Sequence, residues 1–209
     1  MASRRKTITL ALIRCGETTW DVEGRLHGRS DLPLSIDGRT AVSEDVATFR
    51  GGRIGTVYHP PDDAAIETAQ IVAGGAGSRA KAVAELADPD LGVLEGLTAK
   101  DFADRFSKRY KQWQEDPLTL TPPEGEPLVD ARARLFGAVS RLARRSRHDE
   151  IGIVLHPVGL GLLRCWLADR PAADLWSMVR VRPRIERYLL AADLVSELAE
   201  AANAEYQAS

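Results

Sequence analysis

The hydrophobic positions of the chain fall into short continuous runs and longer stretches with helical spacing. Residues 7–13 and 151–155 are continuous runs rich in Ile and Leu, which is typical of strands buried on both faces. Shorter β-favouring runs predict four further strands. These strands are expected at 56–58, 80–83, 179–181 and 184–191.

Between these runs, apolar residues recur three or four positions apart, as on one face of an amphipathic helix. The strongest pattern covers 129–147. Thr98 and Asp101 form a capping pattern that predicts a helix running toward Phe106 and Trp113. Further helices are expected at 37–49, 64–73, 158–167 and 194–206, the first two ended by the glycine pairs at 51–52 and 74–75.

Because predicted strands alternate with predicted helices, the chain is expected to form an α/β three-layer sandwich, with a mostly parallel sheet flanked by helices. The sequence contains no internal repeat and no linker, so residues 1–209 are interpreted as one domain. Pro117, Pro122 and Pro123 interrupt the middle of the chain, and a helical insertion is expected around 99–123.

The composition is that of a folded globular protein. Of 209 residues, 44% are apolar and 28% are charged, and the net charge is −2, so neither disorder nor nucleic-acid binding is expected. No apolar run approaches the ~20 residues of a membrane span. Two cysteines are too few for a disulfide framework, which favours the cytoplasm. The oligomeric state stays open, and a homo-oligomer is compatible with the sequence.

Titratable side chains gather after two of the predicted strands. Arg14 and Cys15 follow the first strand, and His156 follows the strand at 151–155. Ligands of open α/β sheets bind beyond the carboxyl ends of strands. If Glu95 joins these three side chains, the pocket suits an anion, with a nucleophile and a general acid.

The segment 12–39 reads LIRCGETTWDVEGRLHGRSDLPLSIDGR and resembles the opening of the histidine phosphatase superfamily. The branch is the one that holds cofactor-dependent phosphoglycerate mutases and small-molecule phosphatases. Four later segments match the family in the same order: 67–69, 91–96, 123–126 and 154–156. The resemblance covers nearly the whole chain and implies a phosphoglycerate mutase-like fold.

The resemblance also implies a reaction and a set of roles. In the family, one histidine attacks phosphorus, arginines and a second histidine hold the phosphoryl oxygens, and a glutamate moves the proton. Arg14, His156 and Glu95 match three of these residues. Further phosphate or ligand contacts are expected at Thr18, Asp21, Arg25, His27 and Gly28. Neither a metal nor a cofactor is implied.

Four positions depart from the family pattern. Cys15 replaces the nucleophilic histidine, and Asp21 replaces an asparagine, which adds negative charge toward a phosphate dianion. Ala64 stands where the family has a second arginine. Pro157 stands where a glycine N–H faces the phosphate, and proline has no N–H. Each lost donor costs about 2.7–4 kcal/mol of transition-state stabilisation.

The leading hypothesis is therefore a pseudophosphatase whose cleft binds a small molecule or a protein partner. A second hypothesis is an active phosphomonoesterase or mutase that uses His156 and Glu95. A third is a redox-sensitive binding protein based on Cys15, which is otherwise a packing residue. Phosphocysteine enzymes need an arginine six positions after the cysteine, where this chain has Asp21.

Other candidates have a structural interpretation beside the functional one. His156 is either a pocket residue or a core histidine, and His27 is either a surface-loop residue or a ligand contact. His59 is expected to be structural. The alternatives are that it pairs with Asp62 or Asp63, or that these groups form a metal site. His148 is expected to be solvated, Cys165 to lie in the core, and the basic run at 141–147 to be a solvated helix end or an anion or partner patch.

Overall fold

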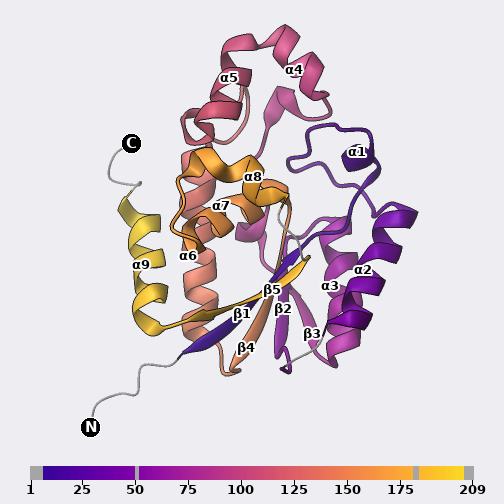
Figure 1. Cartoon of the computed structure of the whole chain (residues 1–209), viewed down its shortest axis with the longest axis vertical. Helices are drawn as coiled ribbons and strands as arrows, with labels where there is room; N and C mark the ends of the chain where they lie inside the picture. The colour runs from indigo at the N-terminus through magenta and orange to yellow at the C-terminus, as the bar shows by residue number, and fades with distance from the viewer. Residues whose placement is uncertain (1–6, 50–51, 181–183, 205–209) are drawn as a thin grey trace.

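Among residues 7–49, 52–180 and 184–204, which the computed structural model describes, five strands form one sheet in the order β3-β2-β4-β1-β5 (Figure 1). β5 runs antiparallel to β1, and the other neighbouring strands are parallel. The expected mostly parallel sheet is therefore confirmed. The strands are β1 (Ile8–Arg14), β2 (Thr56–His59), β3 (Arg79–Ala82), β4 (Glu150–Leu155) and β5 (Ile185–Leu190).

Helices cover both faces of the sheet, which confirms the predicted three-layer sandwich. α2 and α3 lie on one face, and α6 and α7 lie on the other, with α9 packed against α6 (Figure 1). The helices are α1 (Thr19–Val22), α2 (Ile36–Thr48), α3 (Asp63–Ala76), α4 (Ala99–Arg105), α5 (Ser107–Glu115), α6 (Leu128–Arg145), α7 (Pro157–Leu167), α8 (Leu175–Val179) and α9 (Ala192–Ala204).

The two helical layers bury alternate side chains of β1. Leu10 and Leu12 belong to the larger core cluster, which includes residues of α6 and α7. Ala11 and Ile13 belong to a second cluster with α2 and α3. All four side chains are fully buried. A continuous apolar run thus fits a strand that is covered on both faces.

The end of α3 differs from the sequence prediction. The glycine pair at 74–75 does not end this helix, which continues to Ala76. Gly77 caps it with a φ of 61°, a left-handed conformation that glycine adopts without a Cβ clash. The buried Ala65, Ala69 and Ala73 pack the helix against the sheet, and this packing outweighs the low helix propensity of glycine.

The strand predicted at 179–181 is wrong at Val179, which is the last residue of α8. Leu175 and Val179 are four positions apart and both are buried, so helical packing overrides the β propensity of a single valine. Residues 181–183 lie outside the described ranges, as do the end of the predicted tail helix at 205–206 and part of the glycine pair at 51–52.

The segment around 99–123 contains α4, α5 and a 3-10 turn (Pro117–Thr119). The Thr98 hydroxyl accepts the N–H of Asp101 at 3.1 Å, which confirms the predicted helix start. Phe106, with a φ of −136°, separates α4 from α5, so the helix toward Trp113 forms in two pieces. Figure 1 shows both helices beyond the sheet, near α1 and α8.

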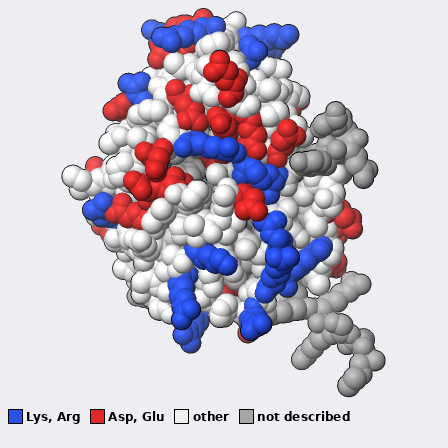
Figure 2. Space-filling view, turned by 180° about the vertical axis from the view of Figure 1, so that it is seen from behind, with Lys and Arg blue, Asp and Glu red and all other residues white. Residues whose placement is uncertain are grey.

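The described surface carries both signs of charge. On the face opposite to that of Figure 1, acidic side chains gather across the middle, and Lys and Arg dominate the lower part (Figure 2). Neither sign covers the whole of this face, in keeping with a net charge of −2. Within the described ranges, no helix is both long enough and apolar enough to cross a bilayer.

Candidate active site

Cys15 and His156 come together at the carboxyl end of the sheet. β1 and β4 are parallel neighbours with Arg14 opposite Leu155, so the next residues of the two strands are adjacent. The Cys15 N–H donates to the Leu155 carbonyl at 2.9 Å. Cys15 is 3% exposed and His156 is 4% exposed. Two of the predicted catalytic positions therefore share one buried place.

Asp62 binds His156, a pairing that the sequence did not suggest. The imidazole Nε2 lies 2.9 Å from Asp62 Oδ1. The same carboxylate caps α3 by accepting the N–H of Ala65 at 2.9 Å, so the helix start fixes its position. His59, the predicted alternative partner of Asp62, instead has its Nδ1 2.6 Å from the carbonyl oxygen of Pro60.

The surroundings of this pair set its charge. Burial alone would lower the pKa of His156, but the adjacent Cys15 and the hydrogen bond and charge of Asp62 raise it well above the ordinary value. Burial alone would raise the pKa of Asp62, but its hydrogen bond with His156 and the imidazolium charge lower it. Both shifts favour the imidazolium–carboxylate form of the pair.

His27 covers His156. The two rings are stacked, with centroids 4.8 Å apart. Trp20 and His27 form a T-shaped contact, with ring centroids 6.4 Å apart. Because His27 is only 7% exposed, its interpretation as a surface-loop residue is wrong. Burial and the nearby charge of His156 lower the pKa of His27. Its ring is therefore neutral, and neither ring nitrogen has a hydrogen-bond partner among the described residues.

Asp88 is a buried carboxyl near His156 that sequence reasoning missed. It is 1% exposed, and it accepts the N–H groups of Val158 and Gly159 at 3.1 and 2.7 Å. Burial raises its pKa to about 6, although the His156 charge and both N–H groups act in the opposite direction. In the sequence, Asp88 stands seven positions before Glu95, but the family motif matches Glu95 and not Asp88. The first turn of α7, a favourable place for an anion, is occupied by this carboxyl.

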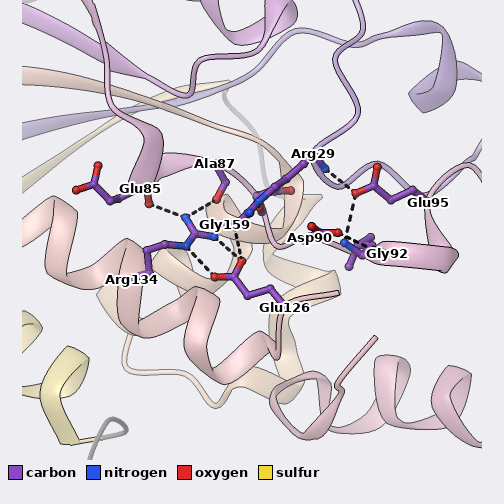
Figure 3. A network of polar contacts seen from close by, with 11 residues as sticks. Arg29, Glu85, Ala87, Asp90, Gly92, Glu95, Glu126, Arg134 and Gly159 are labelled. Atoms are coloured by element: carbon purple, nitrogen blue, oxygen red, sulfur yellow. Dashed lines mark hydrogen bonds and ion pairs between the residues drawn. The ribbon is translucent and has the colours of Figure 1, made fainter. Parts of the chain in front are cut away.

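Glu95, the predicted general acid, is bound by the loop that follows Gly28. Its carboxylate accepts the N–H of Arg29 at 2.7 Å (Figure 3). It also accepts the N–H of Leu91 at 3.3 Å and the hydroxyl of Ser30. A Cβ on Gly28 would lie 2.2 Å from Glu95 Oε1, so a glycine is required for this approach. The structure thus gives both predicted residues a role in holding the loop.

Arg14, the predicted phosphate ligand, is hydrogen-bonded within the protein. Its Nη1 donates to the carbonyl of Val179 at 3.0 Å. Burial and the charge of Arg184 lower the pKa of Arg14, while Glu17 and Asp21 act in the opposite direction. A phosphate at this place would have to compete with the carbonyl for the guanidinium.

Thr18 and Asp21 form the cap of the short helix α1. The N–H and the hydroxyl of Thr18 both donate to Asp21 Oδ2 at 2.8 Å. Arg25, in contrast, is exposed, with an ion pair to Glu23 at 2.5 Å and a hydrogen bond to the Gly96 carbonyl at 2.9 Å. These contacts account structurally for all three predicted ligand residues.

Ala64 and Pro157 fill the two positions where the family donors are lost. Ala64 is fully buried in the first turn of α3. Pro157 is the first residue of α7, where a helix does not need the missing N–H. A cavity of about 230 Å³ adjoins the pocket and is lined in part by Asp62 and Asp88. Within the described ranges, no cluster of His, Cys, Asp and Glu is arranged to hold a metal ion.

A second cluster of charged side chains connects the loop after Gly28 to α6 (Figure 3). Arg134 donates to both carboxylate oxygens of Glu126 at 2.7 and 2.8 Å. It also donates to the carbonyls of Glu85 and Ala87 at 2.8 and 3.0 Å. Arg29 adds a third bond to Glu126, at 2.9 Å. Burial would raise the pKa of Glu126, but the two guanidinium groups lower it.

Known proteins share this architecture. The model of the histidine phosphatase superfamily (branch 1) matches residues 10–184. The "Probable phosphoglycerate mutase GpmB" of Klebsiella pneumoniae is 28% identical over 165 residues, which cover 77% of this chain and 75% of that protein. The structure of Bacillus stearothermophilus YhfR matches with a TM-score of 0.76 and 29% identity, over 86% of this chain and 90% of that chain. A mycobacterial glucosyl-3-phosphoglycerate phosphatase matches with a TM-score of 0.67 and 26% identity, over 82% and 84%.

Proposed function

This chain belongs to the histidine phosphatase superfamily (branch 1), and from that premise we propose that it is a pseudophosphatase. It keeps the fold and a cleft for binding, without histidine-based phosphoryl transfer. Its ligand is a protein, or a small molecule less negative than a phosphomonoester dianion. The four departures at Cys15, Asp21, Ala64 and Pro157 support this proposal.

One observation carries the proposal: the protein's own groups already bind the donors that a phosphoryl group would need. The carboxylate of Asp62 lies 2.9 Å from the His156 Nε2. Asp88 accepts two N–H groups at the start of α7. Arg14 donates to the carbonyl of Val179. A phosphate dianion would have to displace these partners before it could be held for transfer.

Electrostatic repulsion from the carboxylates of the pocket also opposes the binding of a phosphate dianion. Asp62 is ionised, and Asp88, with a pKa of about 6, is mostly ionised at neutral pH. A unit charge repels another at 4 Å by about 4 kcal/mol when the effective dielectric constant is about 20. Since His156 is one cation between two carboxylates, the pocket disfavours a dianion more than a neutral or singly charged ligand.

Phosphate release from an aryl phosphate and a panel of sugar phosphates tests the proposal. The wild type is expected to be no faster than His156→Ala. A restored variant combines Cys15→His, Asp21→Asn, Ala64→Arg and Pro157→Gly. It also carries Asp62→Leu, which removes the carboxylate that binds His156. We expect the restored variant to gain about 100-fold or more in turnover. Turnover in the wild type that equals the restored variant and vanishes in His156→Ala would overturn the proposal.

An active phosphomonoesterase or mutase is the second candidate, and Asp88 is the observation that favours it. A buried carboxyl with a pKa of about 6 is suited to protonate a leaving alkoxide near neutral pH. This candidate predicts wild-type turnover that disappears in His156→Ala. Comparison of Asp88→Asn with Glu95→Ala then identifies the general acid. The variant that lacks the acid loses turnover, and the other variant keeps most of its turnover.

A further inference from the structure

The sulfur of Cys15 has a buried polar contact. Its Sγ lies 3.5 Å from the hydroxyl oxygen of the fully buried Thr68. The same oxygen accepts the N–H of Gly16 at 3.0 Å, which leaves the hydroxyl hydrogen free to point at the sulfur. A hydrogen bond donated to sulfur stabilises its anionic, nucleophilic form. The Thr68 hydroxyl of α3 can therefore act as such a donor when the sulfur is ionised.

The neighbouring imidazole completes a thiol–imidazole–carboxylate series. The register of β1 and β4 places His156 next to Cys15, and Asp62 lies 2.9 Å from the imidazole Nε2. In nucleophilic catalysis a base lies beside the nucleophile, and a third group orients that base. Asp62 can serve as this third group because the N-cap of α3 holds it in place.

His27 is the observation that points to a bound molecule. Both of its ring nitrogens are buried without a hydrogen-bond partner among the described residues, while the ring stacks on His156. Such a buried, unsatisfied polar group lowers the stability of the fold. A small polar molecule bound to the His27 ring nitrogens would offset this cost, because a neutral imidazole offers it one donor and one acceptor.

The enclosure of the pocket restricts what can react there. The side chains of Cys15, His27 and His156 are all less than 8% exposed, which excludes bulky substrates. The carboxylates of Asp62 and Asp88 disfavour anions. Hydrogen peroxide is small, uncharged and both a donor and an acceptor, so it meets each of these conditions.

We propose that Cys15, His156 and Asp62 form a peroxide-reactive thiol site, in which hydrogen peroxide oxidises Cys15 to a sulfenic acid. The Cys15 thiolate attacks one peroxide oxygen, so that an S–O bond forms as the O–O bond breaks. Sulfur loses two electrons and the peroxide is reduced. The departing hydroxide takes the proton of the His156 imidazolium and leaves as water. Asp62 is a positioning residue that keeps the imidazole protonated and oriented. This chemistry goes beyond the proposed binding function and does not depend on it.

The location of the other cysteine determines how this oxidation is reversed. The chain has two cysteines, and Cys165 lies in α7, in the core cluster on the opposite face of the sheet from the cluster that includes Cys15. A disulfide between them is excluded because a bridge needs Cα atoms within about 7 Å, on the same side of the sheet. A small external thiol therefore resolves the sulfenic acid, with a mixed disulfide and water as products.

The test exposes the intact protein to hydrogen peroxide for timed intervals and then unfolds it in dimedone, which traps the sulfenic acid once the site is open. Peptide mass spectrometry maps the adduct. Cys165 is an internal control, because burial raises its pKa to about 11. At pH 7 we expect the Cys15 adduct to form about tenfold faster than that of Cys165 or more. The same ratio is expected for iodoacetamide labelling, which requires no oxidant. Equal or slower modification of Cys15 by both reagents would overturn the proposal.

Asp62→Asn tests the positioning role, because asparagine keeps the helix cap and removes only the charge. The pH profile of Cys15 labelling is expected to move to higher pH, with a rate about tenfold lower at pH 6. Asp63→Asn removes an exposed charge one residue away and should leave the profile unchanged. The other groups near His156 are Cys15, His27 and Asp88, and they are unaltered in both variants.

His156→Gln is the second variant, in case Asp62→Asn perturbs the fold, and a thermal melt accompanies each protein. It should also slow Cys15 labelling about tenfold while Cys165 is unaffected. A Cys15 profile that is identical in the wild type and in folded Asp62→Asn and His156→Gln proteins would refute the proposed relay. Phosphate release is measured separately, so failure here is distinguishable from failure of the pseudophosphatase proposal.

Discussion

Two clusters of charged groups contact the segment 85–95, and they differ in how their charges are balanced. In the pocket at the strand ends, one cation, His156, lies between the carboxyls of Asp62 and Asp88. In the cluster of Figure 3, the two guanidiniums of Arg29 and Arg134 surround the single carboxylate of Glu126. The pocket is buried, whereas the Arg29–Glu126–Arg134 cluster is partly exposed.

The two clusters also differ in how completely their polar groups are paired. In the Arg29–Glu126–Arg134 cluster each carboxylate oxygen has a guanidinium partner, and Nη1 of Arg134 donates to two backbone carbonyls. The pocket instead holds a carboxyl with a raised pKa and a histidine, His27, whose ring nitrogens lack partners among the described residues. Proteins tolerate such groups chiefly where function requires them.

The largest expected effect comes from breaking the pocket pair. His156→Ala leaves the carboxylate of Asp62 buried beside an empty space, and removal of one member of a buried pair costs about 3–5 kcal/mol. The free energy of unfolding at pH 7, from denaturant titration, measures this loss. The double variant His156→Ala/Asp62→Ala should recover part of it, because no unpaired charge is left. A double variant as unstable as the sum of the two single variants would show that the pair does not interact.

The second effect is a pH dependence caused by Asp88. Its pKa is about 6 in the folded protein and 3.8 without the fold. The stabilisation by its protonated form is therefore fully present below pH 3.8 and is lost as the pH rises through 6. The shift corresponds to about 3 kcal/mol. Asp88→Asn should remove this slope from the stability profile between pH 4 and about 6.5, measured by denaturant titration.

The contribution of Asp88 is read from the slope and not from the absolute stability. Asparagine presents only one oxygen to the two N–H groups of α7, so the variant is expected to be less stable at every pH. Glu95→Gln provides the matched control, because it also removes a carboxylate near the same loop. If Asp88→Asn and the wild type kept parallel profiles, Asp88 would not be the group that titrates.

The sequence predicted the layers and the two strand-end positions because both follow from local patterns. The apolar runs of β1 and β4 identified buried strands, and Cys15 and His156 directly follow them. The bond between Asp62 and His156 joins residues 94 positions apart, and no local spacing reports such a contact. Asp88 was missed because the family motif matches Glu95 instead. Burial raises the pKa of Asp88, and burial is a property of the folded chain that the sequence does not report. The burial of His27 could not be predicted either, because the sequence around it is polar and typical of an exposed loop.

A smaller effect is expected from Arg134→Ala in the Arg29–Glu126–Arg134 cluster. The variant removes two bonds to Glu126 and leaves the carbonyls of Glu85 and Ala87 without these donors. Hydrogen bonds to charged groups contribute about 1.5–3 kcal/mol, and the side chain of Arg134 is only 21% exposed, so a loss of about 2 kcal/mol is expected. Thermal unfolding measures it. Arg134→Lys should recover little, since a lysine cannot form the paired bonds to Glu126.

The smallest effect is expected two turns farther along α6, where Arg141 pairs with Glu85 at 2.6 Å. Here the side chains are 39% and 45% exposed, and pairs of this kind contribute less than about 1 kcal/mol. Arg141→Ala should therefore lower the unfolding free energy by less than half of the loss in Arg134→Ala, and 0.5 M salt should abolish most of the difference from the wild type. The two arginines lie on the same helix, so burial and backbone contacts are what distinguish them. An equal, salt-resistant loss at both positions would show that the pairing of charges, and not the enclosure of Arg134, determines how strongly α6 is held.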